Sequence, residues 1–181
     1  MEVYLIRYTT PAVAKGMIYG RTDVALADTF EEEKKILFSK LPKELDAVYT
    51  SPSTRCTKLA SCFLKEYNID ERLYEFNFGR WEGKTWDTVD PQELELWMQD
   101  FVNVCSPEGE SMLQMQERVM SFWKGLTQQP YQKAAVVTHG GVIRLILASV
   151  RSIPLASAFD TPVNYGNIAL VHMSYPKNAF P

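Results

Sequence analysis

Residues 134–144 read AAVVTHGGVIR, and this stretch decides the fold class. Its first four residues are small or β-branched and apolar, which predicts a strand buried on both faces, as inner strands of parallel sheets are. The polar pair Thr138-His139 and two glycines follow, and apolar residues then recur at helical spacing. This order of strand, tight turn and helix predicts that His139 lies at the carboxyl end of a parallel sheet. The free amides and the positive end of the helix dipole favour an anion there.

The glycine pair strengthens this interpretation. Gly140 and Gly141 carry no Cβ, so the backbone at these positions can approach a ligand closely. The alternative is a histidine that only caps the turn. We favour the ligand-binding interpretation because histidine is rare in this chain, which has only two, and because the surroundings of His139 suit an anion.

The whole chain alternates predicted strands and helices. We predict strands at 2–6, 46–50, 71–75, 134–138 and 168–173, and helices at about 29–41, 54–67, 91–102, 111–126 and 142–152. This alternation indicates an α/β protein, a three-layer αβα sandwich with a mostly parallel central sheet. No repeat or linker is recognisable in the sequence, so we expect a single domain over residues 1–181.

Several local signals support these boundaries. Thr29 with Glu32, and Ser111 with Gln114, have the spacing of a capping box at a helix start. Pro91 suits a first helical turn, where its missing N–H costs nothing. The helical spacing of apolar residues indicates which side chains are buried. These expected core residues include Ile36, Leu37, Cys56, Leu59, Trp97, Met98, Val119, Phe122 and Trp123.

The composition narrows the function classes. The chain has 181 residues, of which 46% are hydrophobic and 23% charged, as in ordinary soluble domains. The net charge is −3 and no Lys/Arg cluster occurs, so we expect neither nucleic acid nor an anionic membrane as a partner. No apolar run is long enough for a membrane span, and the first residues are too short for a signal peptide. A cytoplasmic protein is therefore expected.

The cysteines and histidines point the same way. Cys56, Cys62 and Cys105 are odd in number and lack CxxC spacing, which indicates reduced thiols in the cytosol. His139 and His172 have no metal-ligand spacing, so we expect no zinc site. His172 lies in an apolar predicted strand and is interpreted as a structural histidine.

Four charged or polar side chains are expected to meet at one edge of the sheet. Arg7, Glu75 and His139 lie at the carboxyl ends of predicted strands, and Arg55 lies in the first turn of a predicted helix. Two guanidinium groups and an imidazole suit a phosphate dianion, and a carboxyl group among them suits a general acid. Each residue alone has an ordinary alternative as a surface charge, a solvated carboxylate or an ion pair. The hypothesis of a phosphate site therefore depends on the expected convergence of these four side chains at one edge of the sheet.

Five stretches in this order resemble the histidine phosphatase superfamily, which has the phosphoglycerate mutase-like fold. They are Leu5-Ile6-Arg7, Tyr49-Thr50-Ser51-Pro52 with Arg55, LYEFNFGRWEG at 73–83, PEGES at 107–111, and Thr138-His139-Gly140-Gly141. The compact length and the FGRWEG stretch are most similar to alpha-ribazole phosphatases, which act on a phosphomonoester of the cobalamin pathway.

The resemblance implies a role for each matching residue. Arg7, Arg55 and His139 would form the phosphate pocket, Gly140 would contribute its amide, and Glu75 would be the proton donor. The ligand would be a small phosphomonoester or free phosphate. No metal or other cofactor is called for, because cationic side chains fill the role that magnesium has elsewhere. The oligomeric state is open.

One position departs from the family pattern. The family has Arg-His-Gly after the first strand, and that histidine accepts the phosphoryl group, whereas this chain has Arg7-Tyr8-Thr9. A neutral imidazole offers a nitrogen lone pair, while a phenol with a pKa of about 10 keeps its proton at neutral pH. Flanking arginines could stabilise phenolate, but a large decrease in pKa would be needed. The phenol oxygen would also extend past the position of the imidazole nitrogen.

Three interpretations of Tyr8 stay open. In the first, Tyr8 is an inactivating substitution in an otherwise ordinary phosphatase. In the second, the protein is a pseudoenzyme that binds phosphoesters without hydrolysing them. In the third, which we rank last, Tyr8 itself accepts the phosphoryl group. A mutase that returns phosphate to another hydroxyl is a further alternative. We predict weak or absent phosphatase activity with phosphate binding retained, and a gain of at least ~100-fold in turnover for Tyr8→His.

Overall fold

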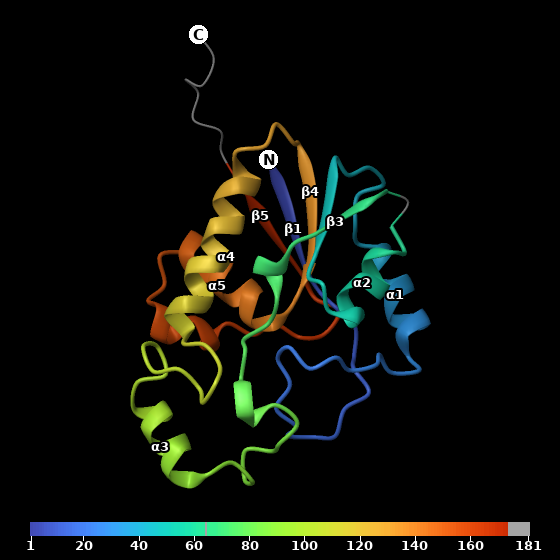
Figure 1. The fold of residues 1–181 in the computed structure, drawn as a ribbon. Coiled ribbons are helices and arrows are strands. Elements are labelled where there is room, and N and C mark those ends of the chain that lie inside the picture. The colour runs from blue at the N-terminus through green and yellow to red at the C-terminus, as the bar shows by residue number, and fades with distance from the viewer. Residues whose placement is uncertain (64, 174–181) are drawn as a thin grey trace.

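The computed structural model describes residues 1–63 and 65–173, and its centre is a five-stranded sheet (Figure 1). The strand order is β3-β2-β4-β1-β5, and the last strand is antiparallel to its neighbour. The strands are β1 (Glu2–Arg7), β2 (Ala47–Thr50), β3 (Tyr67–Ile69), β4 (Lys133–Thr138) and β5 (Ile168–His172). The sheet is mostly parallel, as predicted.

Helices cover both faces of this sheet. They are α1 (Phe30–Phe38), α2 (Thr54–Ala60), α3 (Pro91–Gln99), α4 (Met112–Thr127) and α5 (Gly140–Val150), with short 3₁₀ helices η1 (Glu71–Leu73), η2 (Gly79–Trp81) and η3 (Leu155–Asp160). Helices α1 and α2 lie on one side of the sheet and α4 and α5 on the other, while α3 stands apart from the sheet (Figure 1). This is the predicted three-layer αβα sandwich.

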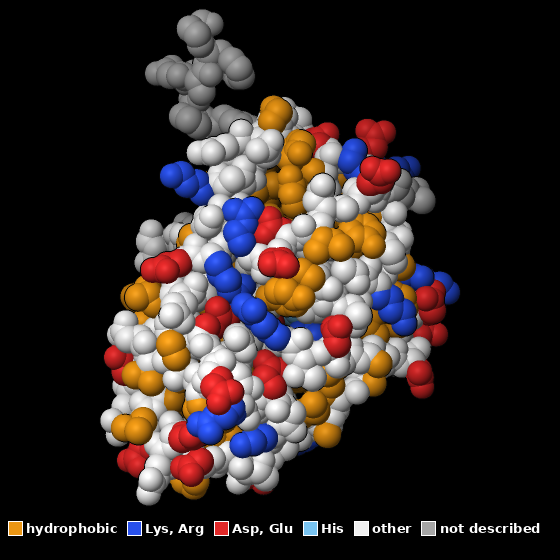
Figure 2. Space-filling view, in the orientation of Figure 1, with side chains coloured by type: hydrophobic (Ala, Val, Ile, Leu, Met, Phe, Trp, Pro, Cys, Tyr) orange, Lys and Arg blue, Asp and Glu red, His pale blue; other side chains and the backbone are white. Residues whose placement is uncertain are grey.

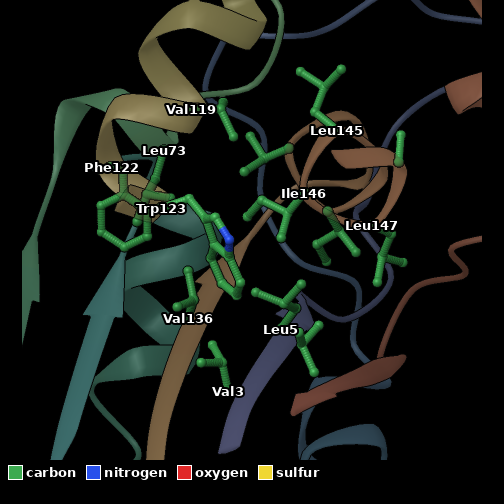
Figure 3. Packing of buried hydrophobic residues seen from close by; sticks show 14 of the residues in the cluster. Val3, Leu5, Leu73, Val119, Phe122, Trp123, Val136, Leu145, Ile146 and Leu147 are labelled. Carbon is green, nitrogen blue, oxygen red and sulfur yellow. The ribbon is translucent and has the colours of Figure 1, made fainter. Parts of the chain in front are cut away.

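The alternation of side chains along β1 supplies both halves of the core. Val3 and Leu5 pack with residues of α4 and α5, and Ile6 packs with residues of α1 and α2. Figure 3 shows the first of these clusters, where Trp123 of α4 and Ile146 of α5 lie over the sheet. Because successive strand residues point to opposite faces, one strand can bind two helical layers.

The stretch that opened the sequence analysis folds as predicted up to His139, but α5 begins at Gly140, so the two glycines form its first turn and not a turn before it. The side chains of residues 134–137 in β4 are 0% exposed, as an inner strand covered on both faces requires. His139 is the N-cap residue of α5. At α4 the predicted capping box is present, with Ser111 accepting from the amide of Gln114 and the Gln114 side chain accepting from the amide of Ser111.

The predicted third strand at 71–75 is wrong. The strand lies earlier, at Tyr67–Ile69, where it pairs with Val48–Thr50. The Asp70 side chain then accepts a hydrogen bond from the amide of Arg72 and caps η1 instead. The predicted helix over 54–67 is also too long, because α2 ends at Ala60. Residue 64, which that prediction included, lies outside the described residues.

The start of α1 differs from its predicted cap. Thr29 accepts no capping hydrogen bond, and its hydroxyl donates to Glu33 rather than pairing with Glu32. The other oxygen of Glu33 accepts from the amide of Thr10, so this carboxylate joins the helix to the chain after β1. Leu37 is buried as predicted, but Ile36 is 60% exposed and that prediction is wrong.

Helix α3 ends at Gln99, three residues before the predicted end, and has no fully buried residue. Its Met98 is 60% exposed, so the prediction of a buried Met98 is wrong, whereas Trp97 packs partly buried against the core. The helix lies away from the sheet (Figure 1), and its Trp97 packs against Trp81 of η2 instead. In β5, His172 is exposed and lies at the edge of the sheet near Glu2, so it is not a core histidine.

Positive and negative side chains are interspersed over the face shown in Figure 2. Within residues 1–63 and 65–173, no helix has the length and apolar character needed to cross a bilayer.

Strand register determines what meets at the carboxyl edge of the sheet. Arg7 lies opposite Thr138, and Thr50 lies opposite Val137. The residues that follow these pairs, including His139, are therefore level with one another at one edge.

Candidate active site

His139 is fully buried at this edge, and both its ring nitrogens have partners. Its Nδ1 lies 3.2 Å from Nη2 of Arg55, and its Nε2 lies 2.7 Å from the hydroxyl of Ser51. A guanidinium can only donate, so Nδ1 accepts and Nε2 carries the proton. Burial, and then the positive charges of Arg55, Arg7 and Arg118, lower the pKa of His139 well below its ordinary value. The imidazole is neutral.

Arg55 is 1% exposed and projects from the first turn of α2 into the same place. Its Nη1 donates to the carbonyl of Thr22 at 2.9 Å, and its Nη2 donates to that of Gly20 at 2.5 Å. Its Nε is buried and has no hydrogen-bond partner among the described residues. A buried N–H without a partner is costly, so this group is available to an acceptor.

Glu82 holds the loop that supplies those two carbonyls. Its carboxylate accepts from the amides of Gly20, Arg21 and Thr22. Burial raises the pKa of Glu82, but these amides and the Thr22 hydroxyl outweigh it, so the pKa lies below its ordinary value. A Cβ on Gly20 would lie 1.7 Å from the carbonyl oxygen of Phe76, so only glycine fits there. The FGRWEG stretch thus fixes the partners of Arg55.

Arg7 ends β1 and lies across the first turn of α5. Its Nη1 donates to the carbonyl of Val163 at 2.6 Å, and its Cζ lies 3.8 Å from the ring centroid of Tyr165. A Cβ on Gly140 would be 3.3 Å from this Cζ. A glycine at 140 therefore allows the guanidinium to lie close against the backbone.

Glu75 reaches the same turn from the other side, although it follows η1 and not a strand. Its carboxylate accepts from the amides of Gly141 and Phe76, each at 3.0 Å. A Cβ on Gly141 would lie 2.2 Å from Oε1 of Glu75. A side chain is therefore excluded at these two positions for different reasons, because Gly140 leaves room for Arg7 and Gly141 leaves room for Glu75.

Arg118 of α4 supports Glu75 from behind, and the sequence reasoning did not identify it. Its guanidinium donates to the carbonyls of Arg72, Tyr74 and Glu75 and forms a two-pronged ion pair with Glu110. The one signal in the sequence that could have identified Arg118 is its place between buried apolar positions of α4. Its contacts fix the turn that carries Glu75, so it is a positioning residue.

Tyr8 stands among these groups and is 2% exposed. Its ring meets that of His139 edge-on at 5.5 Å between centroids, and the Cζ of Arg55 lies 5.2 Å from its centroid. Its hydroxyl donates to that of Tyr19 at 3.4 Å. Burial raises the pKa of Tyr8 and outweighs the arginines, which lower it. The phenol keeps its proton, which argues against Tyr8 as the acceptor of phosphate.

Two further tyrosines close the inner part of the site, and sequence reasoning missed both. The hydroxyls of Tyr19 and Tyr165 lie 2.5 Å apart, and the rings of Tyr8 and Tyr165 are 5.7 Å apart. Burial is the first cause that raises the pKa of each of these two tyrosines to about 12. Tyr8, Arg55 and His139 are therefore enclosed, whereas Arg7 and Glu75 are half-buried.

The structure therefore brings all the predicted site residues to one end of the sheet. It gives no contact for the amide of Gly140 that would define its role. Among the described residues, no group of three or more His, Cys, Asp or Glu side chains is placed to hold a metal ion.

Comparison with known proteins connects this arrangement to one family. Residues 3–180 match the model of the histidine phosphatase superfamily, branch 1. The chain is 29% identical to a protein of Hydrogenobacter thermophilus named as a candidate phosphoserine phosphatase, over 98% of this chain and 92% of that protein. It is 27% identical to the adenosylcobalamin/alpha-ribazole phosphatase of Escherichia coli, over 92% of this chain and 87% of that one. The crystal structure of a phosphoglycerate mutase from Thermus thermophilus matches with a TM-score of 0.75 at 30% identity, covering 94% of this chain and 92% of that one.

Proposed function

The chain belongs to the histidine phosphatase superfamily, and on that basis we propose that it is a phosphomonoesterase whose hydrolytic step is weak or absent because of Tyr8. The observation that carries the proposal is a buried, protonated tyrosine between Arg55 and His139, at the position of the family's nucleophile. This chain keeps the proposed phosphate-binding groups and lacks the histidine that accepts the phosphoryl group in the family.

The proposed roles follow from charge and position. Arg7, Arg55 and His139 hold the phosphate oxygens, with the amide of Gly140 beside them. The Nε groups of Arg7 and Arg55 support this role, because both are buried hydrogen-bond donors that have no acceptor among the described residues. Glu75 is the general acid. Its carboxylate contacts Gly141, and the guanidinium of Arg7 lies against the neighbouring Gly140, so Glu75 is within reach of a phosphomonoester bound at this turn.

Restoring a histidine at position 8 supplies the missing step. The imidazole lone pair forms a P–N bond while the bond from phosphorus to the leaving oxygen breaks, and Glu75 gives its proton to that oxygen. The carboxylate then takes a proton from water, whose oxygen forms a new bond to phosphorus as the P–N bond breaks. In the chain with Tyr8, the proton on the hydroxyl prevents the first attack.

We further propose alpha-ribazole 5′-phosphate as the first candidate substrate and the cytoplasm as the location. The name of the Escherichia coli relative supports the substrate, as does the FGRWEG stretch. The partner is a small phosphomonoester or free phosphate. A mutase activity is supported by the name of the Thermus thermophilus relative, and it would need an element that excludes water.

A second candidate is a non-catalytic phosphoester-binding protein. It is favoured by the enclosure of Tyr8 and by the engagement of both nitrogens of His139.

Turnover and binding measured side by side separate the two candidates. The natural chain and Tyr8→His are assayed with p-nitrophenyl phosphate and alpha-ribazole 5′-phosphate, and both are titrated with inorganic phosphate in a calorimeter. We expect phosphate binding in both and efficient hydrolysis only in Tyr8→His. Binding without hydrolysis in both would favour the non-catalytic protein, and no binding in either would contradict the proposed pocket.

A further inference from the structure

Arg144 of α5 is a cationic residue to which neither the sequence analysis nor the proposed mechanism assigned a role. It follows Gly140 by four residues, so the two share one face of the helix. Long helical side chains point toward the amino end, which directs the Arg144 guanidinium to the turn that carries Gly140. A Cβ on Gly140 would lie 3.0 Å from Nη1 of Arg144 and 3.3 Å from Cζ of Arg7. Two guanidinium groups therefore flank one glycine.

No carboxylate neutralises this pair within residues 1–63 and 65–173. Neither Arg7 nor Arg144 takes part in any of the ion pairs there. Glu75 is the nearby carboxylate, and its oxygens accept from backbone amides. Burial, and then the charge of Arg7, lower the pKa of Arg144, and Glu75 only partly opposes them. Two adjacent cations in a half-buried site repel each other, and an anion between them would relieve this repulsion.

Two contacts orient the guanidinium of Arg144, and only one of its nitrogen atoms donates to a described residue. Its Nε donates to the carbonyl of Thr161 at 2.9 Å, and its Cζ lies 5.7 Å from the ring centroid of Phe159. Its two Nη groups donate to no described residue, and neither is among the buried atoms that lack a partner. Because its Nε is held by Thr161 and its Nη groups donate to no described residue, this guanidinium can bind an anion through its Nη groups.

Arg144 also lies apart from the enclosed part of the site. No contact between described residues joins its guanidinium to Tyr8, Arg55 or His139, whereas Arg55 contacts both of the others. Under the proposed function Arg55 binds the phosphate, so Arg144, which lies outside this enclosed group, would be closer to the rest of the substrate. We propose that Arg144 binds a second anionic group, a carboxylate or a second phosphate, on the leaving group of the substrate.

This inference rests on the proposed function and narrows its substrate class. It favours phosphomonoesters of acids or bisphosphates over a phosphomonoester with an uncharged leaving group such as alpha-ribazole 5′-phosphate. The alternative is that Arg144 only anchors the segment after η3 through Thr161. That role would need its Nε alone and would be indifferent to the charge of the ligand.

The test uses three ligands that differ at one end: ethyl phosphate, 2-phosphoglycolate and ethane-1,2-diol bisphosphate. The proteins are the natural chain and Tyr8→His, each with Arg144→Met, Arg144→Lys or Arg151→Met. Arg151 is exposed at the other end of the same helix, so its removal is a matched loss of charge. Dissociation constants come from calorimetry, kcat/KM from phosphate release, and thermal unfolding checks that each variant is folded.

We expect one or both of the ligands with a second anionic group to bind roughly tenfold more tightly than ethyl phosphate, as a charge-assisted hydrogen bond would give. This ratio should fall close to one in Arg144→Met, fall less in Arg144→Lys, and stay the same in Arg151→Met. The ligand that loses its advantage identifies the group as carboxylate or phosphate.

Other results overturn the inference. An unchanged ratio in Arg144→Met, or an equal loss of affinity for all three ligands, would assign Arg144 to structure or to the phosphate itself. If Tyr8→His hydrolyses ethyl phosphate but shows no preference, the inference fails and the proposed function stands. If the ratio depends on Arg144 but Tyr8→His hydrolyses nothing, the proposed function fails and the inference stands. If no ligand binds to any of these proteins, both fail.

Discussion

Replacing Tyr8 by histidine should turn this chain into an active phosphatase. The new imidazole would lie among the groups that now surround the phenol ring, with the Cζ of Arg55 at 5.2 Å and that of Arg7 at 5.9 Å from the ring centroid. Cations at this distance disfavour imidazolium, and the same cause already contributes to the low pKa of His139. The introduced histidine would therefore be neutral at pH 7, with a lone pair free for attack on phosphorus.

Chemistry sets the largest gain in kcat/KM that Tyr8→His can give, and the geometry of the site reduces it. Loss of a covalent nucleophile removes several orders of magnitude, and restoring one can at most recover them. The enclosure by Tyr19 and Tyr165 restricts access, so only part of the recovery is expected. We expect at least ~100-fold in kcat/KM, which corresponds to about 2.7 kcal/mol of transition-state stabilisation. The smaller ring should cost roughly 1–2 kcal/mol of unfolding free energy.

The assay is hydrolysis of p-nitrophenyl phosphate at neutral pH, with Tyr8→Phe as the matched control. The phenylalanine variant keeps the ring and loses the hydroxyl, so it should stay at the activity of the natural chain. A Tyr8→His variant no faster than Tyr8→Phe would refute the reasoning that position 8 limits the chemistry. Equal gains in both would indicate that the hydroxyl blocks the pocket and that no nucleophile is restored.

Three further predictions concern the groups around position 8. In the Tyr8→His background, Glu75→Gln should lower turnover of an alkyl phosphate by roughly 10²–10⁴-fold, and of p-nitrophenyl phosphate much less, because p-nitrophenolate leaves without a proton. In that background Gly141→Ala should also reduce alkyl phosphate turnover, because its Cβ would lie 2.2 Å from Oε1 of Glu75; Gly125→Ala on α4, with nothing within 4 Å, should leave it unchanged. The depressed pKa of His139 means that the unfolded chain binds a proton that the folded chain does not, so stability is highest above pH 6.5 and falls below it. Urea unfolding should show a loss approaching about 1.4 kcal/mol per pH unit below that value, and His139→Gln should flatten the slope; an unchanged slope would contradict a neutral, buried His139.

The fold was largely predictable because its strongest signals are local. Residues 134–144 carry a buried strand followed by a helix, and the structure has both, with the helix beginning at Gly140, two residues earlier than predicted. The strand at 71–75 failed because Asp70 satisfies the amide of Arg72, a turn contact that strand periodicity does not reveal. The burial of Met98 failed because α3 has no sheet beneath it, and helical spacing does not say what lies opposite a helix.

The site was predictable only where the sheet determines it. Arg7 and the residues after β4 share an edge because parallel strands end together. Tyr19, Tyr165 and Arg118 were missed because their contacts join segments far apart in the sequence, and loop conformation decides where those side chains point. Tyr8 was identified as the anomaly from the family resemblance, but its enclosure required the structure.

The most direct test of the central claim is a crystal structure of Tyr8→His soaked with orthovanadate, which mimics phosphate in transfer. The account predicts one vanadate within hydrogen-bond distance of the guanidinium groups of Arg7 and Arg55 and of a ring nitrogen of His139, with the imidazole introduced at position 8 bonded to the vanadium. Vanadate bound elsewhere, or a site that remains closed by Tyr19 and Tyr165 at saturating vanadate, would contradict it.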